Sequence, residues 1–456
     1  MHDPSLSRRD FLAVAAGTAA SLSTGFALAQ PGGDRPKRSA GVEVLNPRGR
    51  VPVSLIIDDS TCLVNLAHFC IPQFAEVFPD RYRQEWRKLP REIPDDFVRE
   101  FADWCGERGV KGKYSIVPYP ACVGWVDREM PGWTRRQLEQ SVTLVRERML
   151  SNWDIHPEMV THTWGIDVRT GRPYPDRSAA NMENWGFSVG KSTDFLTEYL
   201  AYALQILKNA GLPCEGVTTP GGFGNKVLDE LSQATLRSCR EIFDAEIPHY
   251  FRHLYTDDRS VAPRVEYAAR LDSDRPGCVV SIVGATGDWF GGWDGLVTPE
   301  AEKYITADLK GGRMIEVIDR GEPAIMVCHW PGIYCNGHKT GLAAFQSVVD
   351  RLERRYENLI WMTLSEIARY WAAKELTAVT VVADGFAFHA PFGTPSMTVR
   401  FPSVAEGVDF VHHEESTPLR SVGRRLDLAP GTFHRDREST TACFDLIKGE
   451  SRLVVH

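Results

Sequence analysis

The sequence predicts an α/β fold: a deformed (β/α) barrel of parallel strands followed by a small β-rich C-terminal domain or extension. Two observations predict it. Short apolar runs typical of buried strands alternate with longer segments of helical periodicity over residues 51–375. From about residue 376 the helical periodicity stops, and turn-rich strand patterns such as "TAVTVVADGFAFHA" take over to residue 456.

The first half of the predicted barrel reads strand, helix, strand, helix, strand. "VPVSLII" is an apolar strand, and "DDFVREFADWCGERG" is a helix because its apolar residues recur at helical spacing before a glycine. "VKGKYSIVPYP" is the next strand and "TRRQLEQSVTLVRERML" the next amphipathic helix. "EMVTHTW", residues 158–164, is then expected as a short strand.

The second half continues the alternation. "STDFLTEYLAYALQILKNAG" is a helix with Ser192 as its N-cap and Gly211 as its stop signal. "CEGVTTPGG", "GCVVSIVGA" and "PAIMVCHW" are three further strands. "NLIWMTLSEIARYWAAK" is a strand followed by a helix, which a capping box of Thr363 and Glu366 begins.

The N-terminal segment has the pattern of a twin-arginine export signal over residues 1–29. Arg8 and Arg9 precede a modest apolar run that ends in small residues, and cleavage is expected after Ala29. A membrane anchor is less favoured because the run is short and rich in Gly, Ser and Thr. We therefore expect the twin-arginine machinery to export the chain to the periplasm or beyond, with no membrane span in the mature protein. Residues 30–50, rich in Gly, Pro and Arg, are expected to be a linker.

Charge and cysteine content exclude several classes of protein. The formal net charge is -8, whereas nucleic-acid-binding proteins usually carry a basic surface. The ten cysteines form no CxxC pair, so neither a zinc ribbon nor a thioredoxin-like site is predicted.

Polar and aromatic residues recur just after the predicted strands, where barrel enzymes place their chemistry. Asp58 and Asp59 follow the first strand directly. Two adjacent carboxylates at the end of a buried strand raise the pKa of one of them unless a cation or a donor lies nearby, although aspartates also collect in turns. The later strand ends carry His162, Trp164, Asp167, Gly221, Gly222, Asp288, Trp289, Trp293, His329 and Trp330. His249 has no supporting context of this kind.

In order, the segments "LIIDDS", "VTHTW", "TTPGGFG", "MVCHWPG" and "IWMTLSEIARYW" resemble the polysaccharide deacetylase (NodB-like) superfamily over roughly residues 51–375. The resemblance implies that Asp58 is a general base and His329 a catalytic acid. It also implies that Asp59 and His162 bind a divalent metal such as Zn²⁺. Residues expected to contact the substrate are Trp164, Gly221, Gly222, Trp289 and Trp330.

The sequence departs from the family pattern at two points. The family's second motif has two histidines four residues apart, and here Ile166 stands four residues after His162. His156, which precedes the predicted strand, and Asp167 are comparable candidates for the third metal ligand. The arginine that the family places before the proline of its third motif is replaced by Thr218 and Thr219.

The resemblance implies an exported, metal-dependent hydrolase that removes acetyl or similar acyl groups from a carbohydrate. Two alternatives remain open from sequence. A metal-independent glycoside hydrolase would pair Asp58 or Asp59 with Asp288, and a non-catalytic carbohydrate-binding protein could use the same barrel.

Overall fold

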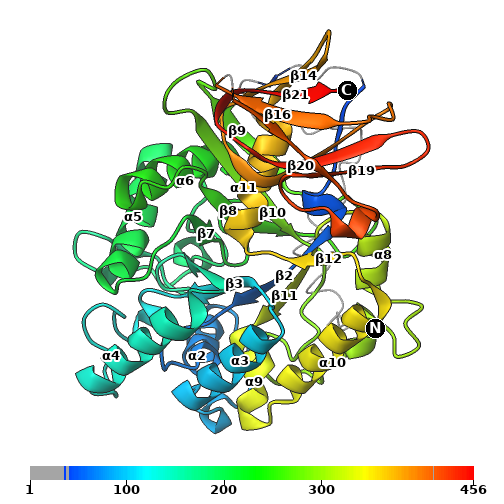
Figure 1. Cartoon of the computed structure of the whole chain (residues 1–456). Coiled ribbons are helices and arrows are strands. Elements are labelled where there is room, and N and C mark those ends of the chain that lie inside the picture. Colours follow the sequence, from blue (N-terminus) through cyan, green and yellow to red (C-terminus); the bar gives the residue numbers. More distant parts are fainter. Residues whose placement is uncertain (1–34, 37–40, 414) are drawn as a thin grey trace, which may run out of the picture.

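The computed structural model describes residues 35–36, 41–413 and 415–456 (Figure 1). The twin-arginine signal predicted for residues 1–29 lies outside these residues. None of the helices in the described part of the chain combines the length and the apolar character needed to cross a bilayer.

The first sheet is parallel and holds the first strands of the α/β region that the sequence predicts to be a barrel; this region is called the barrel region below. Its strand order is β11 (Ala324–His329), β2 (Val51–Asp58), β3 (Gly112–Ile116) and β4 (Trp153–Pro157), and β12 (Leu359–Trp361) also pairs with β2. Every residue of β2 is buried, as expected for a strand covered on both faces.

The second sheet continues the series with β7 (Gly216–Thr218), β8 (His249–Leu254) and β10 (Gly277–Gly284), which are parallel. β9 (Arg264–Ala269) pairs with β10 in the antiparallel direction. A small hairpin of β5 (Ile166–Asp167) and β6 (Arg172–Pro173) stands apart.

The two sheets meet at both ends of the series. Glu158 and Thr218 form an isolated parallel bridge between the segments after β4 and in β7. On the other side the Ala285 amide donates to the Ile325 carbonyl at 2.8 Å, which joins the end of β10 to β11. The predicted α/β fold with parallel strands is therefore confirmed, with its strands divided between two sheets.

Helices alternate with the strands. The longer ones are α2 (Leu66–Val77), α3 (Asp95–Glu107), α4 (Arg135–Leu144), α5 (Thr193–Asn209), α6 (Leu228–Phe243), α10 (Thr340–Arg355) and α11 (Leu364–Leu376). The sequence analysis predicted α3, α4, α5 and α11, and the structure adds α2, α6 and α10 among these longer helices. The shorter ones are α7 (Ala301–Tyr304), α8 (Arg313–Asp319) and α9 (Trp330–Tyr334). Ser192 caps α5, and Thr363 with Glu366 forms the predicted capping box of α11.

The third barrel strand lies earlier in the chain than the sequence pattern predicts. The prediction placed it at residues 158–164, but the ladder with β3 runs over Trp153–Pro157 and the following residues form a loop. Met159 and His162 have φ angles of 51° and 64°, which no strand accommodates. The correction places His156 inside a strand and His162 on a loop.

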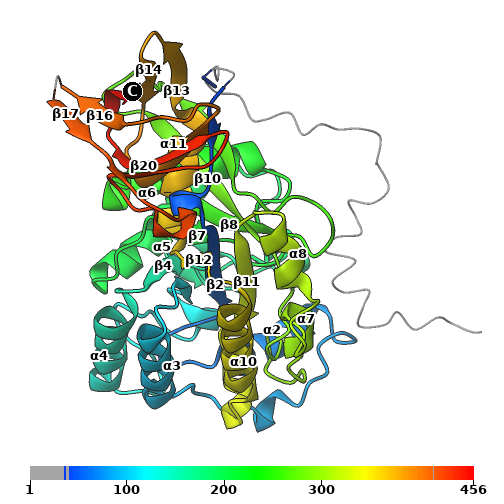
Figure 2. The ribbon, with the colours of Figure 1, turned by 45° about the vertical axis from the view of Figure 1, so that its right-hand side comes forward.

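The C-terminal region forms two five-stranded sheets. One contains β15 (Thr394–Phe401), β18 (Arg420–Ser421), β19 (Thr432–Arg435) and β20 (Thr440–Leu446). The other contains β13 (Ala378–Val382), β14 (Gly385–Ala390), β16 (Val408–His412), β17 (Glu415–Pro418) and β21 (Gly449–Val455). β1 (Glu43–Val44) lies within the expected linker. It pairs with β15 and is the fifth strand of the C-terminal sheet that contains β15, β18, β19 and β20. Figures 1 and 2 show these sheets, orange to red, at the opposite end of the molecule from α2, α3, α4 and α10.

One apolar cluster joins the barrel to the C-terminal sheets through α11. It contains Ile325 of the barrel, Ile367 and Trp371 of α11, and Phe388 and Phe444 of the C-terminal strands, all buried. The C-terminal region therefore covers apolar surface of the barrel.

From this shared core we expect a fragment of residues 30–375 to aggregate, because it exposes the apolar face of α11 that the C-terminal sheets bury. A fragment of residues 41–456, which keeps the cluster, is the control and should remain monomeric in size-exclusion chromatography. Cooperative unfolding of a monomeric 30–375 fragment would show that the boundary separates independent domains.

Candidate metal centre and catalytic groups

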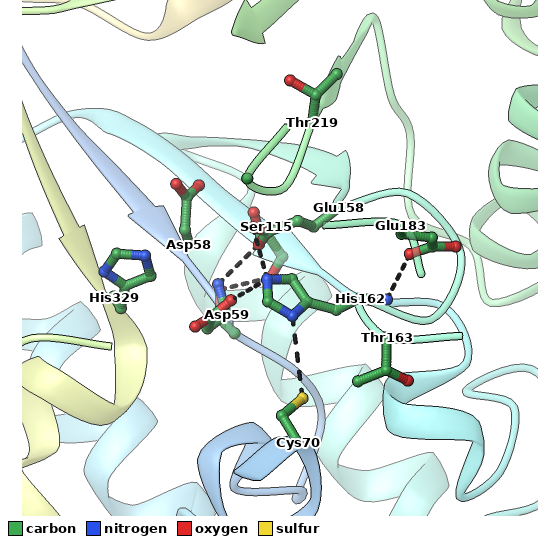
Figure 3. Close-up of polar contacts among 12 residues, drawn as sticks. Asp58, Asp59, Cys70, Ser115, Glu158, His162, Thr163, Glu183, Thr219 and His329 are labelled. Carbon is green, nitrogen blue, oxygen red and sulfur yellow. Dashed lines mark hydrogen bonds and ion pairs between the residues drawn. The ribbon is translucent and has the colours of Figure 1, made fainter. Parts of the chain in front are cut away.

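The two aspartates at the end of β2 face different groups: Asp58 is its last residue, and Asp59 follows it. Both are buried, at 6% exposed for Asp58 and 2% for Asp59. Asp59 has a φ of 58°, so the chain leaves the strand at this residue and the two carboxylates turn apart. Figure 3 shows Asp58 on the side of His329, and Asp59 next to His162.

Asp59, Glu158 and His162 converge in a buried cluster. His162 Nε2 lies 2.7 Å from Asp59 Oδ1 and 3.5 Å from Glu158 Oε1. The Asp59 amide donates to Glu158 Oε2 at 2.7 Å, which ties the first strand end to the loop after β4. The other imidazole nitrogen, His162 Nδ1, faces Cys70 Sγ at 3.9 Å (Figure 3).

The chemistry of this cluster fits a divalent cation. Its three ligand atoms lie within 4.8 Å of one another. Asp59 Oδ1 is buried and has no hydrogen bond of ordinary geometry among the described residues. Burial lowers the pKa of His162, but the carboxylates of Asp59 and Glu158 outweigh it and raise that pKa well above its usual value. Two buried carboxylates thus require a positive charge, and imidazole with carboxylate oxygens is a ligand set that Zn²⁺ accepts.

Glu158 is the member of the cluster that the sequence analysis missed. Glu158 stands four residues before His162 in the sequence. The family motif instead led us to expect the second ligand four residues after His162, where Ile166 stands. The two expected candidates lie elsewhere. His156 points to His249 from β4, at 3.0 Å between the Nε2 atoms, and Asp167 Oδ1 accepts from the Arg169 amide on an exposed turn.

A buried lysine neutralises Asp58. Lys113, fully buried on β3, forms an ion pair with the Asp58 carboxylate. Its ammonium also donates to the Ile57 carbonyl at 3.1 Å and to Ser115 Oγ at 2.7 Å. Burial raises the pKa of Asp58 to about 6, and the charge of Lys113 opposes this rise. Lys113 therefore supplies a buried positive charge to Asp58 from β3, and the sequence analysis did not single out this residue.

His329 ends β11 in register with Asp58 of β2. Its Nδ1 donates to Asp288 Oδ2 at 2.8 Å. Burial lowers the pKa of His329, but the carboxylates of Asp59, Asp288 and Asp58 outweigh it and raise the pKa to about 10. These carboxylates thus favour the imidazolium form of the ring, which carries a proton on Nε2.

Glu183 fixes the loop that carries His162. Its carboxylate accepts from three consecutive backbone amides, those of Val160, Thr161 and His162, at 2.6–3.2 Å, and from the Tyr199 hydroxyl at 2.5 Å. No local sequence pattern reveals this contact, because the glutamate comes from an irregular segment 21 residues after His162.

The expected substrate-binding residues are three tryptophans, which differ in burial, and two glycines. Trp164 and Trp330 are buried, at 3% and 1% exposed, and act as core residues. Trp289 is partly buried. Gly221, with a φ of 47°, and Gly222 approach the Asn184 carbonyl so closely that a Cβ on Gly221 would lie 2.6 Å from it. These two glycines therefore permit a tight backbone approach beside the site.

Aromatic rings gather next to the cluster of Asp59, Glu158 and His162. The Phe74 ring lies 6.4 Å from His162 between centroids and packs against Trp185 and Trp293. Both tryptophans are only partly buried. Phe74 thus lies between His162 and these two tryptophans in the chain of ring contacts.

No protein-family model and no curated protein sequence matches the chain. Among solved structures it is similar to a probable polysaccharide deacetylase from Pseudomonas aeruginosa PAO1 (TM-score 0.37, 10% identity, 71% of this chain and 91% of that chain). It is also similar to PuuE allantoinase (TM-score 0.34, 12% identity, 72% of this chain and 91% of that chain). The catalytic domain of GH30 xylanase C from Talaromyces cellulolyticus is a third (TM-score 0.27, 8% identity, 91% and 99%). The first carries the name of the superfamily that the sequence motifs resemble, and all three likenesses are distant.

The contacts of Glu183 predict a graded effect of its substitution. Glu183→Ala leaves four buried donors without their acceptor, each costing about 1–3 kcal/mol, and should lower the melting temperature and the metal content together. Glu183→Gln keeps one acceptor oxygen and should lose less. Thermal unfolding measures the melting temperature of each variant, and elemental analysis measures its metal content. If both variants match the wild type in these two quantities, the loop does not depend on Glu183.

Proposed function

We propose that this protein is an exported, metal-dependent hydrolase that removes acetyl or similar acyl groups from a carbohydrate. The observation that carries the proposal is the convergence of Asp59, Glu158 and His162 beside Asp58 and His329. The sequence motifs that resemble polysaccharide deacetylases support the same reaction class.

Asp59, Glu158 and His162 would hold the metal, and Zn²⁺ suits their two carboxylates and one imidazole. When bound, such an ion supplies Lewis acidity, which lowers the pKa of a coordinated water and polarises a carbonyl oxygen. Glu183 and Glu158 would keep His162 and Asp59 in place through their backbone amides.

Asp58 is the proposed general base. It would accept a proton from the water that attacks the acyl carbon. Its buried ion pair with Lys113 opposes the effect of burial and favours the carboxylate that this step requires.

His329 is the proposed general acid. Its Nε2 would give a proton to the leaving nitrogen or oxygen of the substrate as the bond to the acyl carbon breaks. Asp288 would orient the ring through the Nδ1 hydrogen bond and stabilise its charged form. Because Asp288 already accepts this bond, the geometry favours this role over that of a second carboxylate in a glycoside hydrolase.

A carbohydrate substrate is implied by the resemblance and agrees with the partly buried rings of Trp185 and Trp293, which pack against Phe74 next to His162. Flat aromatic faces can bind the apolar face of a sugar. Binding of acetylated oligosaccharides, followed by release of acetate, measures this part of the proposal.

Export by the twin-arginine route rests on Arg8 and Arg9. Replacing both by Lys should leave the uncleaved precursor in the cytoplasm, as measured by fractionation and immunoblotting. Normal export and cleavage of the doubly substituted chain would contradict this route.

The division of work between the two aspartates predicts different outcomes for the same substitution. Asp59→Asn removes an anionic ligand and should strip metal and activity together. Asp58→Asn should retain most of the metal and lose ~10²–10⁴-fold in turnover, the usual contribution of a positioned base. The assay is metal content beside hydrolysis of an acetylated sugar or a simple acetyl ester.

Two further variants serve as matched controls for this pair. His162→Ala should resemble Asp59→Asn, and His329→Ala should resemble Asp58→Asn. Thermal unfolding of each variant separates loss of function from loss of fold, because Asp58→Asn leaves the buried Lys113 without its partner. If both aspartate variants keep metal and activity, the pair is a turn and the hydrolase proposal fails.

A further inference from the structure

We propose that Asp154, His156 and His249 form a second divalent-metal site inside the barrel, separate from the centre at Asp59. The three residues come from β4 and β8, and their ligand atoms lie within 4.8 Å of one another. This inference does not depend on the proposed hydrolase activity.

The two imidazoles face each other in the buried interior. His156 and His249 are both fully buried, and their Nε2 atoms are 3.0 Å apart. The Nδ1 atoms point the other way. His156 Nδ1 lies 3.4 Å from Thr218 Oγ1, whereas His249 Nδ1 is buried and has no hydrogen-bond partner of ordinary geometry among the described residues.

The contact with Thr218 favours, for His156, the tautomer that metal ligands adopt. A ring that gives its proton to an oxygen at Nδ1 presents a lone pair at Nε2. Because the Nε2 atoms of the two rings converge on one point, a cation there can bind both rings. Asp154 adds an anionic oxygen to the same place, and two imidazoles with one carboxylate suit Zn²⁺ or a similar transition metal.

Gly216 of β7 keeps space open at this point. A Cβ on Gly216 would lie 2.7 Å from the Nε2 atoms of both histidines, closer than any side chain tolerates. Any larger residue at position 216 would therefore place its side chain at the point on which the two Nε2 atoms converge, and glycine leaves that point open.

The site would tie the barrel to α11. The Asp154 carboxylate accepts from the Ser365 amide at 2.6 Å and from the Ser365 hydroxyl at 2.8 Å, at the first turn of α11. A metal held by Asp154, His156 and His249 would thus link β4, β8 and the helix that leads to the C-terminal sheets. Because Asp58 and His329 are not among its ligands, its role would be structural.

Crystals of the wild-type protein grown with Zn²⁺ test the proposal directly by anomalous scattering at the zinc edge. We expect a peak ~2.0–2.2 Å from the Nε2 atoms of His156 and His249, the usual Zn–N distance. A crystal with no peak there, in which the two rings share a direct N–H···N hydrogen bond, overturns the proposal whatever happens at Asp59.

Metal content of variants provides the independent measurement. Wild-type protein should bind two equivalents of Zn²⁺, and His249→Gln and Asp59→Asn should each bind one. His253→Gln, a histidine on the same strand outside the cluster, is the matched control and should keep two. One equivalent in the wild type that Asp59→Asn alone removes overturns the second site. One equivalent that His249→Gln alone removes supports it and contradicts the proposed hydrolase centre.

Discussion

The site depends on the compensation of buried carboxylates by buried positive charge. Asp58, Asp59, Glu158 and Asp288 lie at or near the ends of parallel strands, away from bulk water. Lys113 pairs with Asp58, His329 pairs with Asp288, and His162 or a bound cation serves Asp59 and Glu158. An unpaired charge in such a setting costs several kcal/mol, so each pairing also fixes the position of its members.

The same carboxylates hold an unfavourable backbone in place. Asp59 and His162 both have positive φ angles, 58° and 64°, which cost non-glycine residues about 1–3 kcal/mol each. The amide of Asp59 donates to Glu158 and that of His162 to Glu183. Buried glutamates thus stabilise two turns that aim Asp59 Oδ1 and His162 Nε2 at one point, and the loop geometry and the charge balance support each other.

A polar interior continues below the strand ends. Lys113, His156 and His249 are fully buried on parallel strands whose other buried side chains are largely apolar. Burying such groups is costly without partners, and here they meet one another, backbone carbonyls or hydroxyls. The C-terminal sheets close the apolar side of α11, whose first turn contacts this interior through Ser365 and Asp154.

The sequence by itself determined the alternation of strands and helices, the capping of α5 and α11, and the strand ends that carry Asp58, Asp59 and His329, because hydrophobic periodicity and caps are local signals. The sequence analysis misplaced β4. Met159 and His162 have positive φ angles that end the strand, but the pattern of apolar and polar residues does not reveal these angles. Only the tertiary structure decided that Glu158, Lys113 and Glu183 join the site and that His156 faces His249. Those contacts join residues on different strands and loops, where spacing along the chain does not report distance in space.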